Sequence, residues 1–153
     1  MPSELNRREA LAAAAGFAVC GGLFAGSPAA GAATPHYGEA LARFLDGREP
    51  AAGGIRLDAP EVAEDGNMVA VSVRVESPMT EADHVRRIAL LSTRNPVAEV
   101  AIFELTPRSG EAFVGSRIRL AESQDVVALA ETSDGRILQT RREVRVTVGG
   151  CGA

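Results

Sequence analysis

Hydrophobic and polar residues alternate through most of the chain after residue 54, with short turn signals between the runs. The clearest run is Met68–Glu76, where valine occupies every second position and the residues between are small, polar or charged. A period of two is typical of a β-strand with one buried face. Asp65-Gly66-Asn67 and Asn95-Pro96 are among the turn signals that separate such runs. The pattern predicts strands at 55–57, 68–76, 85–92, 99–105, 114–120, 126–131, 136–139 and 143–148.

About seven or eight short strands at regular spacing predict an all-β fold, an immunoglobulin-like β-sandwich. The sequence contains no Trp, so the Cys…Trp…Cys signature of true immunoglobulin domains is absent and only the architecture is expected. Ahead of the strands, Ala40, Leu41, Phe44 and Leu45 have helical spacing. This spacing predicts a short amphipathic N-terminal helix over 36–46, within a single domain at 34–148.

Residues 1–33 have the composition of an export signal. Arg7 and Arg8 are followed by a mildly apolar stretch over 11–24 and a run of small residues over 27–33. This order is typical of a cleaved signal peptide, and the arginine pair indicates the twin-arginine route. The apolar stretch is shorter than the ~20 residues that a membrane span requires. We therefore expect a periplasmic protein with no membrane contact after cleavage.

Cleavage at that position makes Cys151 the only cysteine of the mature chain, because Cys20 is removed with the signal. A lone cysteine in an oxidising compartment indicates an intermolecular disulfide or a reactive thiol. Cys151 stands among Gly149, Gly150 and Gly152, and glycine has the widest range of backbone conformations. We predict that residues 149–153 form a flexible arm that can extend roughly 16 Å from the last strand. The alternative is a frayed terminus without a function.

Composition and charge exclude several other functions. The net charge is −4, with no basic cluster for nucleic acid. The two histidines, His36 and His84, lie far apart and lack metal-ligand spacing, and no nucleotide-binding loop is present. Acidic Glu81 and Asp83 lie in a predicted loop and are more typical of a solvated turn than of an acid–base pair. We therefore predict no metal, no cofactor and no catalytic residues.

The thiol of Cys151 also lacks the neighbours that activate a catalytic cysteine. An ordinary thiol has a pKa near 8.5, and no Arg, Lys or His lies within the last five residues. The terminal carboxylate of Ala153 disfavours the thiolate. The sequence therefore predicts a covalent carrier on which separate enzymes act, and not an enzyme.

Five segments together resemble SoxY, the sulfur-carrier family of bacterial thiosulfate oxidation. They are Val146–Gly152, Val75–Val85, Asn95-Pro96, Arg117–Ala121 and Ala130–Gly135. The resemblance extends over essentially the whole mature chain and departs at Ala153, where the family typically has a second glycine. It implies a periplasmic subunit that forms a heterodimer with a SoxZ-like β-sandwich. It also implies that sulfur intermediates are attached to Cys151 and presented to periplasmic sulfur-oxidation enzymes.

Two other functions fit the same residues. The chain can be an exported β-sandwich assembly module whose lone cysteine forms an intermolecular disulfide. It can also be a SoxY-like carrier that serves a different sulfur or alcohol-oxidation system. In each case we expect a partner, because segments 69–73 and 97–103 are rich in small apolar residues on both faces.

Overall fold

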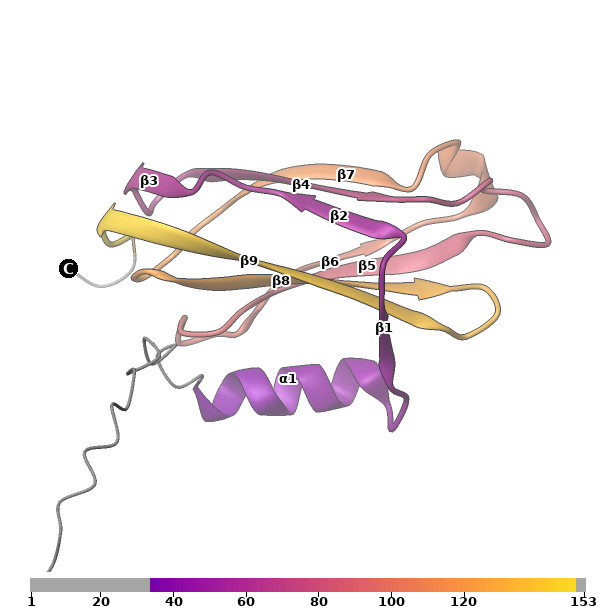
Figure 1. Ribbon diagram of the computed structural model, residues 1–153, viewed down its shortest axis with the longest axis horizontal. Helices are drawn as coiled ribbons and strands as arrows, with labels where there is room; N and C mark the ends of the chain where they lie inside the picture. Colours follow the sequence, from indigo (N-terminus) through magenta and orange to yellow (C-terminus); the bar gives the residue numbers. More distant parts are fainter. Residues whose placement is uncertain (1–33, 151–153) are drawn as a thin grey trace, which may run out of the picture. The chain divides into compact units, whose positions relative to one another are not determined.

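The computed structural model describes residues 34–150, which form three layers (Figure 1). A three-stranded sheet packs on a larger sheet, and helix α1 covers the other face of the larger sheet. Residues 1–33 and 151–153 lie outside the described part, so the predicted signal with Arg7 and Arg8 is not described. No helix among the described residues is long and apolar enough to span a membrane.

The larger sheet has six strands, five of which follow one another in space in the order β1-β9-β8-β5-β6. The pairs among β9, β8, β5 and β6 are antiparallel, whereas β1 runs parallel to the start of β9. The sixth strand, β3, runs parallel to the other end of β9. The bounds are β1 Pro50–Ala52, β3 Val62–Asp65, β5 Val85–Ser92, β6 Glu99–Glu104, β8 Gln124–Thr132 and β9 Ile137–Val148.

The smaller sheet is antiparallel, with the order β2-β4-β7. Its strands are β2 Ile55–Asp58, β4 Val69–Val75 and β7 Phe113–Ile118, and the short 3-10 helix η2 (Pro107–Ser109) precedes β7. The alternation predicted for β4 is confirmed, because all four of its valines are buried and the residues between them are at least partly exposed. The valine face therefore packs toward the larger sheet, as a period of two requires.

The main core lies between the sheets, and the two central strands of the larger sheet are buried on both faces. Along β5 and β8, alternate residues join two different clusters. Ile88, Leu90, Val126, Ala128 and Ala130 face the smaller sheet, whereas Ala89, Leu91, Val127 and Leu129 face α1. Continuous apolar runs are typical of strands that are covered on both sides.

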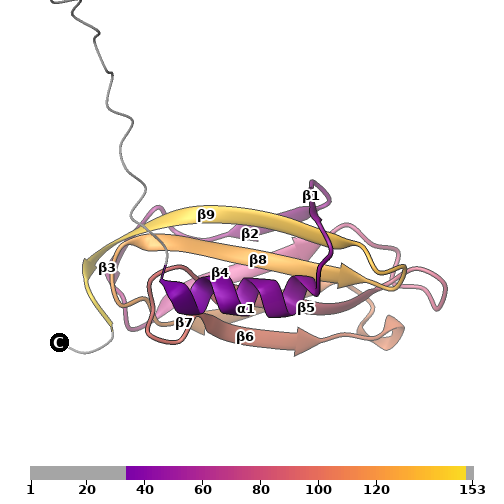
Figure 2. The same ribbon diagram turned by 90° about the horizontal axis from the view of Figure 1, so that it is seen from below.

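Helix α1 (Pro35–Leu45) confirms the predicted N-terminal helix and lies along the strands of the larger sheet (Figure 2). Ala40 and Phe44 are buried against β5 and β8, and Tyr37 and Leu41 pack at the margin of this contact. The helix ends where Asp46 takes a left-handed conformation with φ 48°. Its amphipathic face is therefore covered by the domain itself.

The sandwich prediction is confirmed, but some strand boundaries differ from the prediction. Strands β1 and β3 were not predicted, because they are short, largely exposed and parallel to a distant part of the chain. The strands predicted at 136–139 and 143–148 are one continuous strand, β9. The residues between them, Thr140 to Arg142, pair with β8 in unbroken register although their side chains are polar.

Candidate functional site

The C-terminal end of β9 lies at the same end of the sandwich as β3 (Figure 1). Gly149 and Gly150 continue from β9 and are partly buried. Cys151 and Gly152 lie outside the described residues. Because consecutive Cα atoms are about 3.8 Å apart, the position of Gly150 determines where Cys151 begins. The residues around Gly150 therefore define the base of the predicted arm.

Three backbone hydrogen bonds connect this base to two other segments. The amide of Gly150 donates to the carbonyl oxygen of Leu120 at 2.9 Å, and the amide of Leu120 donates to Gly66 at 2.8 Å. The amide of Gly66 donates to the carbonyl oxygen of Val148 at 2.7 Å. The bonds thus link the end of β9, the β3–β4 turn and the β7–β8 loop.

The glycines of this base are packed backbone against backbone. A Cβ atom built on Gly149 is 2.2 Å from the carbonyl oxygen of Ala121, and one on Gly150 is 2.4 Å from that of Gly66. A Cβ atom on Gly66 is 2.3 Å from the carbonyl oxygen of Leu120. No larger residue fits these positions without a shift of the backbone. The structure gives Gly149 and Gly150 a packing role that the prediction of arm flexibility did not include.

A buried pair of amide side chains, Asn95 and Gln124, holds the β7–β8 loop in place. Gln124 Nε2 donates to Asn95 Oδ1 at 2.7 Å, and that oxygen also accepts the amide of Ala121 at 3.0 Å. Asn95 Nδ2 donates to the carbonyl oxygen of Arg119 at 2.8 Å. The buried amides are therefore satisfied by contacts that fix the backbone on both sides of Leu120.

The two histidines, His36 and His84, and the acidic residues Glu81 and Asp83 do not assemble into a site. His36 is exposed, and His84 is partly buried with Nδ1 3.1 Å from the carbonyl oxygen of Thr80. Glu81 and Asp83 are exposed. Within residues 34–150, no group of three or more His, Cys, Asp or Glu side chains can hold a metal ion.

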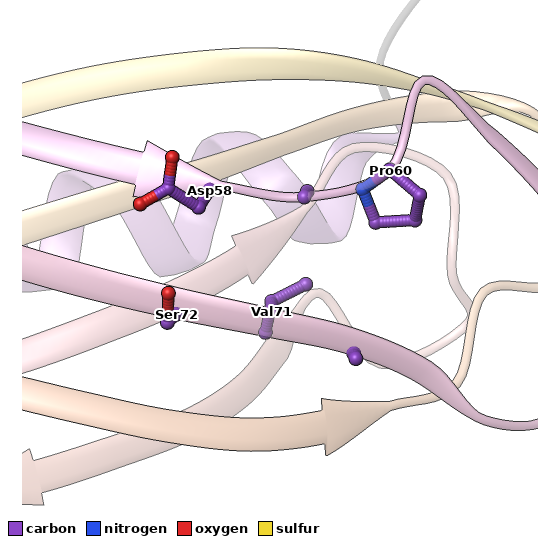
Figure 3. Close-up of a pocket in the computed structure, with 6 residues that line it drawn as sticks. Asp58, Pro60, Val71 and Ser72 are labelled. Atoms are coloured by element: carbon purple, nitrogen blue, oxygen red, sulfur yellow. The ribbon is translucent and has the colours of Figure 1, made fainter.

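A shallow hollow of about 350 Å³ lies beside β2 and β4 (Figure 3). It is lined by Asp58, Ala59, Pro60, Ala70, Val71 and Ser72. Asp58 and Ser72 are register partners across the two strands and supply its polar side chains. One carboxylate and one hydroxyl in an open hollow are not a nucleophile–base–orienting set. The arm base is therefore the stronger candidate site.

Comparison with known proteins first identifies the class of protein. The family described as "Sulfur oxidation protein SoxY" matches residues 41–151, which include Cys151. The chain belongs to the SoxY family, and the resemblance found in the sequence is confirmed. A search of curated proteins gave no match.

Solved structures support the same assignment. The sulfur carrier protein SoxY from Chlorobium limicola f thiosulfatophilum is 28% identical to this chain, with a TM-score of 0.61. The match covers 72% of this chain and 96% of that protein. A superoxide reductase (neelaredoxin) from Ignicoccus hospitalis is 23% identical over 61% of this chain and 80% of its own, with a TM-score of 0.55. A putative superoxide reductase from Thermotoga maritima is 21% identical over 65% of this chain and 88% of its own, with a TM-score of 0.53. The two reductases share the fold alone, and a shared fold does not carry a shared reaction.

Proposed function

We propose that this chain is a periplasmic sulfur-carrier protein that binds intermediates of thiosulfate oxidation covalently on Cys151. The observation that carries the proposal is the SoxY family match, which extends to residue 151. The similarity to a sulfur carrier protein over 96% of that protein's length supports it. The arm base supports it too, because it joins Gly150, the residue before Cys151, to Leu120 in the β7–β8 loop.

The proposed loading step joins the sulfane sulfur of thiosulfate to the thiol of Cys151. A new S–S bond forms, the thiol proton is released, and two electrons pass to an electron-transfer protein through a coupling enzyme. A second enzyme then hydrolyses the resulting S-thiosulfonate, so that water supplies the oxygen of the departing hydrogen sulfate and a persulfide stays on Cys151. A third enzyme oxidises the outer sulfur of the persulfide to a sulfonate, with oxygen from three water molecules and six electrons passed to an electron-transfer protein. The carrier itself contributes the sulfur nucleophile and its delivery.

Export and partnership are part of the same proposal. Arg7 and Arg8 direct the chain through the twin-arginine route, and the signal over 1–33 is removed. The mature domain pairs with a SoxZ-like β-sandwich to form a heterodimer. Gly152 leaves the chain next to the thiol free of side-chain bulk, so that Cys151 can enter the cleft of a partner enzyme.

The test is Cys151→Ser in a reconstituted thiosulfate-oxidising system. This substitution removes the sulfur nucleophile and preserves the size of the side chain. We expect a normally folded protein with no thiosulfate-dependent turnover, and sulfur adducts at Cys151 of the parent by intact-protein mass spectrometry. Substantial turnover of the variant contradicts the proposal.

Cys20→Ser is the matched control, because it makes the same substitution in the segment that export removes. Its mature protein should have the same mass and turnover as the parent. A parent that shows only disulfide-linked dimers, without sulfur adducts, supports the assembly module instead.

A further inference from the structure

We propose that Gly66 and the β7–β8 loop form an anchor that fixes the point at which Cys151 leaves the domain. The anchor consists of Gly66, the carbonyl groups of Leu120 and Ala121, and the two arm glycines that contact them. Gly149 and Gly150 are then a docked base, and the free part of the arm begins at Cys151. This inference rests on the proposed carrier function and makes Gly66 a positioning residue for the thiol.

The hydrogen bonds at the base form a continuous chain through three segments. Gly150 donates to Leu120, Leu120 donates to Gly66, and Gly66 donates to Val148, the last residue of β9. The chain therefore starts and ends on the same short stretch of backbone around Gly149. Release of Gly150 from Leu120 leaves an amide and a carbonyl group of this partly buried site without their partners.

The lack of room for a side chain at Gly66 is a second and separate observation. Gly66 is buried, and a Cβ atom added to it falls within 3 Å of Leu120 O, Gly150 N and Val146 Cγ1. Glycines elsewhere in the domain differ. Gly38 in α1 has nothing within 4 Å of an added Cβ atom, and Gly115 on β7 has only ring atoms of Phe113 at 3.9 Å and beyond. Gly66, Gly149 and Gly150 thus have an atom within 3 Å of the added Cβ position, whereas Gly38 and Gly115 do not.

The β7–β8 loop, which contacts the arm glycines, is itself fixed by buried side chains. Asn95 and Gln124 are 6% and 4% exposed, and their side chains bond to the backbone of Arg119, Ala121 and Arg94. Leu120 is fully buried between two of these residues. The carbonyl groups of Leu120 and Ala121, which contact Gly150 and Gly149, therefore belong to a loop that is fixed by a buried hydrogen-bond network.

Anchoring changes the volume that the thiol can explore. A chain free from Val148 onward places residue 151 up to roughly 10 Å from the strand end, whereas a chain fixed at Gly150 allows about 3.5 Å. A reach shorter by about threefold confines the thiol to a volume smaller by more than tenfold. The effective concentration of the thiol at the mouth of a docked enzyme rises accordingly.

The first experiment is amide hydrogen exchange by NMR on the carrier with a free thiol. We expect the Gly150 amide to exchange at least tenfold more slowly than an unstructured peptide of the same sequence. The Gly152 amide should exchange at the peptide rate and serves as the internal reference. A Gly150 amide that exchanges as fast as Gly152 overturns the anchor, whatever the outcome for sulfur transfer.

The second experiment compares Gly66→Ala and Gly149→Ala with Gly38→Ala, which adds the same methyl group in open space. Both anchor variants should lose the protection of the Gly150 amide and raise the KM for the carrier in the reconstituted thiosulfate-oxidising system by several-fold, with kcat little changed. Alkylation of Cys151 by iodoacetamide should stay within about twofold of the parent. Gly38→Ala should match the parent in all three measurements.

Two results separate the anchor from the carrier function. Unchanged KM and unchanged Gly150 protection in Gly149→Ala overturn the anchor, and this variant remains informative if Gly66→Ala does not fold. A parent carrier without any thiosulfate-dependent turnover contradicts the carrier function, and the exchange measurement then still decides whether the anchor exists.

Discussion

At the scale of single residues, the carboxylate of Glu131 lies between two arginines. Oε1 is 2.8 Å from Arg48 Nη1, Oε2 is 2.5 Å from Arg87 Nε, and the Glu131 side chain is only 13% exposed. Burial raises the pKa of Glu131, but the hydrogen bonds and charges of Arg48 and Arg87 lower it by more, so its pKa lies below the ordinary value. Arg48 also donates to the carbonyl oxygens of Leu45 and Gly135. The cluster therefore joins the end of α1 to the β8–β9 hairpin.

Glu131→Gln should lower the free energy of unfolding by about 2 kcal/mol at pH 7, because charge-assisted hydrogen bonds are lost. The folded-state pKa is depressed, so this contribution is fully present above the unfolded value of 4.5 and is lost as the pH falls through the folded pKa. Urea denaturation at pH 7 and pH 4 should therefore show a smaller difference between parent and variant at the lower pH.

Glu111→Gln is the control for this prediction. Glu111 pairs with Arg74 at 3.0 Å, but both side chains are more than half exposed. The change should alter stability by less than about 0.5 kcal/mol at either pH. An equal effect of both substitutions at pH 7 would show that the partly buried position of Glu131 is irrelevant.

Local sequence predicted some residue environments and missed others. The valines of β4 were predicted correctly, because a period of two depends only on neighbours. Arg48 and Glu131 are 83 positions apart, so no local pattern relates them. Gly66 was recognised as a turn residue, but its contacts with Leu120 and Gly150 depend on how three distant segments meet. For the same reason, the packing role of Gly149 and Gly150 was hidden in the sequence.

At the scale of elements, α1 contributes a second core on the outer face of the larger sheet. Phe44 is 5% exposed, and the guanidinium carbon of Arg87 lies 4.5 Å from the centre of its ring. The covered face of the sheet includes Leu91, Val127 and Leu129, all nearly fully buried. Without α1, the apolar outer face of β5 and β8 is open to water.

Phe44→Ala should reduce the free energy of unfolding by about 3 kcal/mol, because it removes buried apolar surface and leaves a cavity. Arg43→Ala is the control on the same helix, since its side chain is 69% exposed and its ion pair with Glu99 is 3.8 Å long. That change should have an effect of less than about 0.5 kcal/mol. Urea titration measures both, and a loss below about 1 kcal/mol for Phe44→Ala contradicts a core role for α1.

The strands that the sequence predicted share strong alternation or continuous apolar runs, as in β4 and β5. The strands that it missed, β1 and β3, are short and pair in parallel with the two ends of β9, and only Ala63 of β3 is buried. β9 was divided in the prediction because polar residues interrupt its pattern, yet its register with β8 is continuous. Backbone pairing thus extends a strand where side-chain periodicity has ended.

At the scale of the whole domain, two strand edges carry exposed apolar side chains. Among the described residues, β6 pairs only with β5, and β7 pairs only with β4. Ile102 on β6 is 42% exposed, Phe113 on β7 is 45% exposed, and Val97 just before β6 is 69% exposed. Open edges with apolar side chains favour pairing with another chain. The interface predicted around 97–103 falls on the β6 edge and stays a prediction, whereas β4 is central in its sheet and offers only its outer face.

The predicted partner complex is a one-to-one heterodimer. Co-expressed with a co-encoded SoxZ-like subunit, the protein should elute as a heterodimer in which Cys151 remains titratable. Alone, it should self-associate or form Cys151–Cys151 dimers. A stable monomer with no affinity for that subunit in size-exclusion chromatography refutes the prediction.

Ile102→Arg should weaken the heterodimer by at least about tenfold, because it places a charge on the apolar edge. Val62→Arg is the matched control, since Val62 on β3 is 49% exposed and lies outside the predicted interface. Isothermal titration of each variant against the SoxZ-like subunit measures the dissociation constants. Equal affinities of both variants would place the interface elsewhere.

The twelve-residue length of β9 has a mechanical consequence. The chain bends at Gly150, whose amide is bonded to Leu120, so a load on the proposed arm passes first to this base and then to the end of β9 along the strand axis. The hydrogen bonds from β9 to β8 lie across that axis, and they carry such a load together in shear instead of opening one after another. Under the proposed carrier function, the sandwich can therefore keep its shape while a partner protein pulls on the arm.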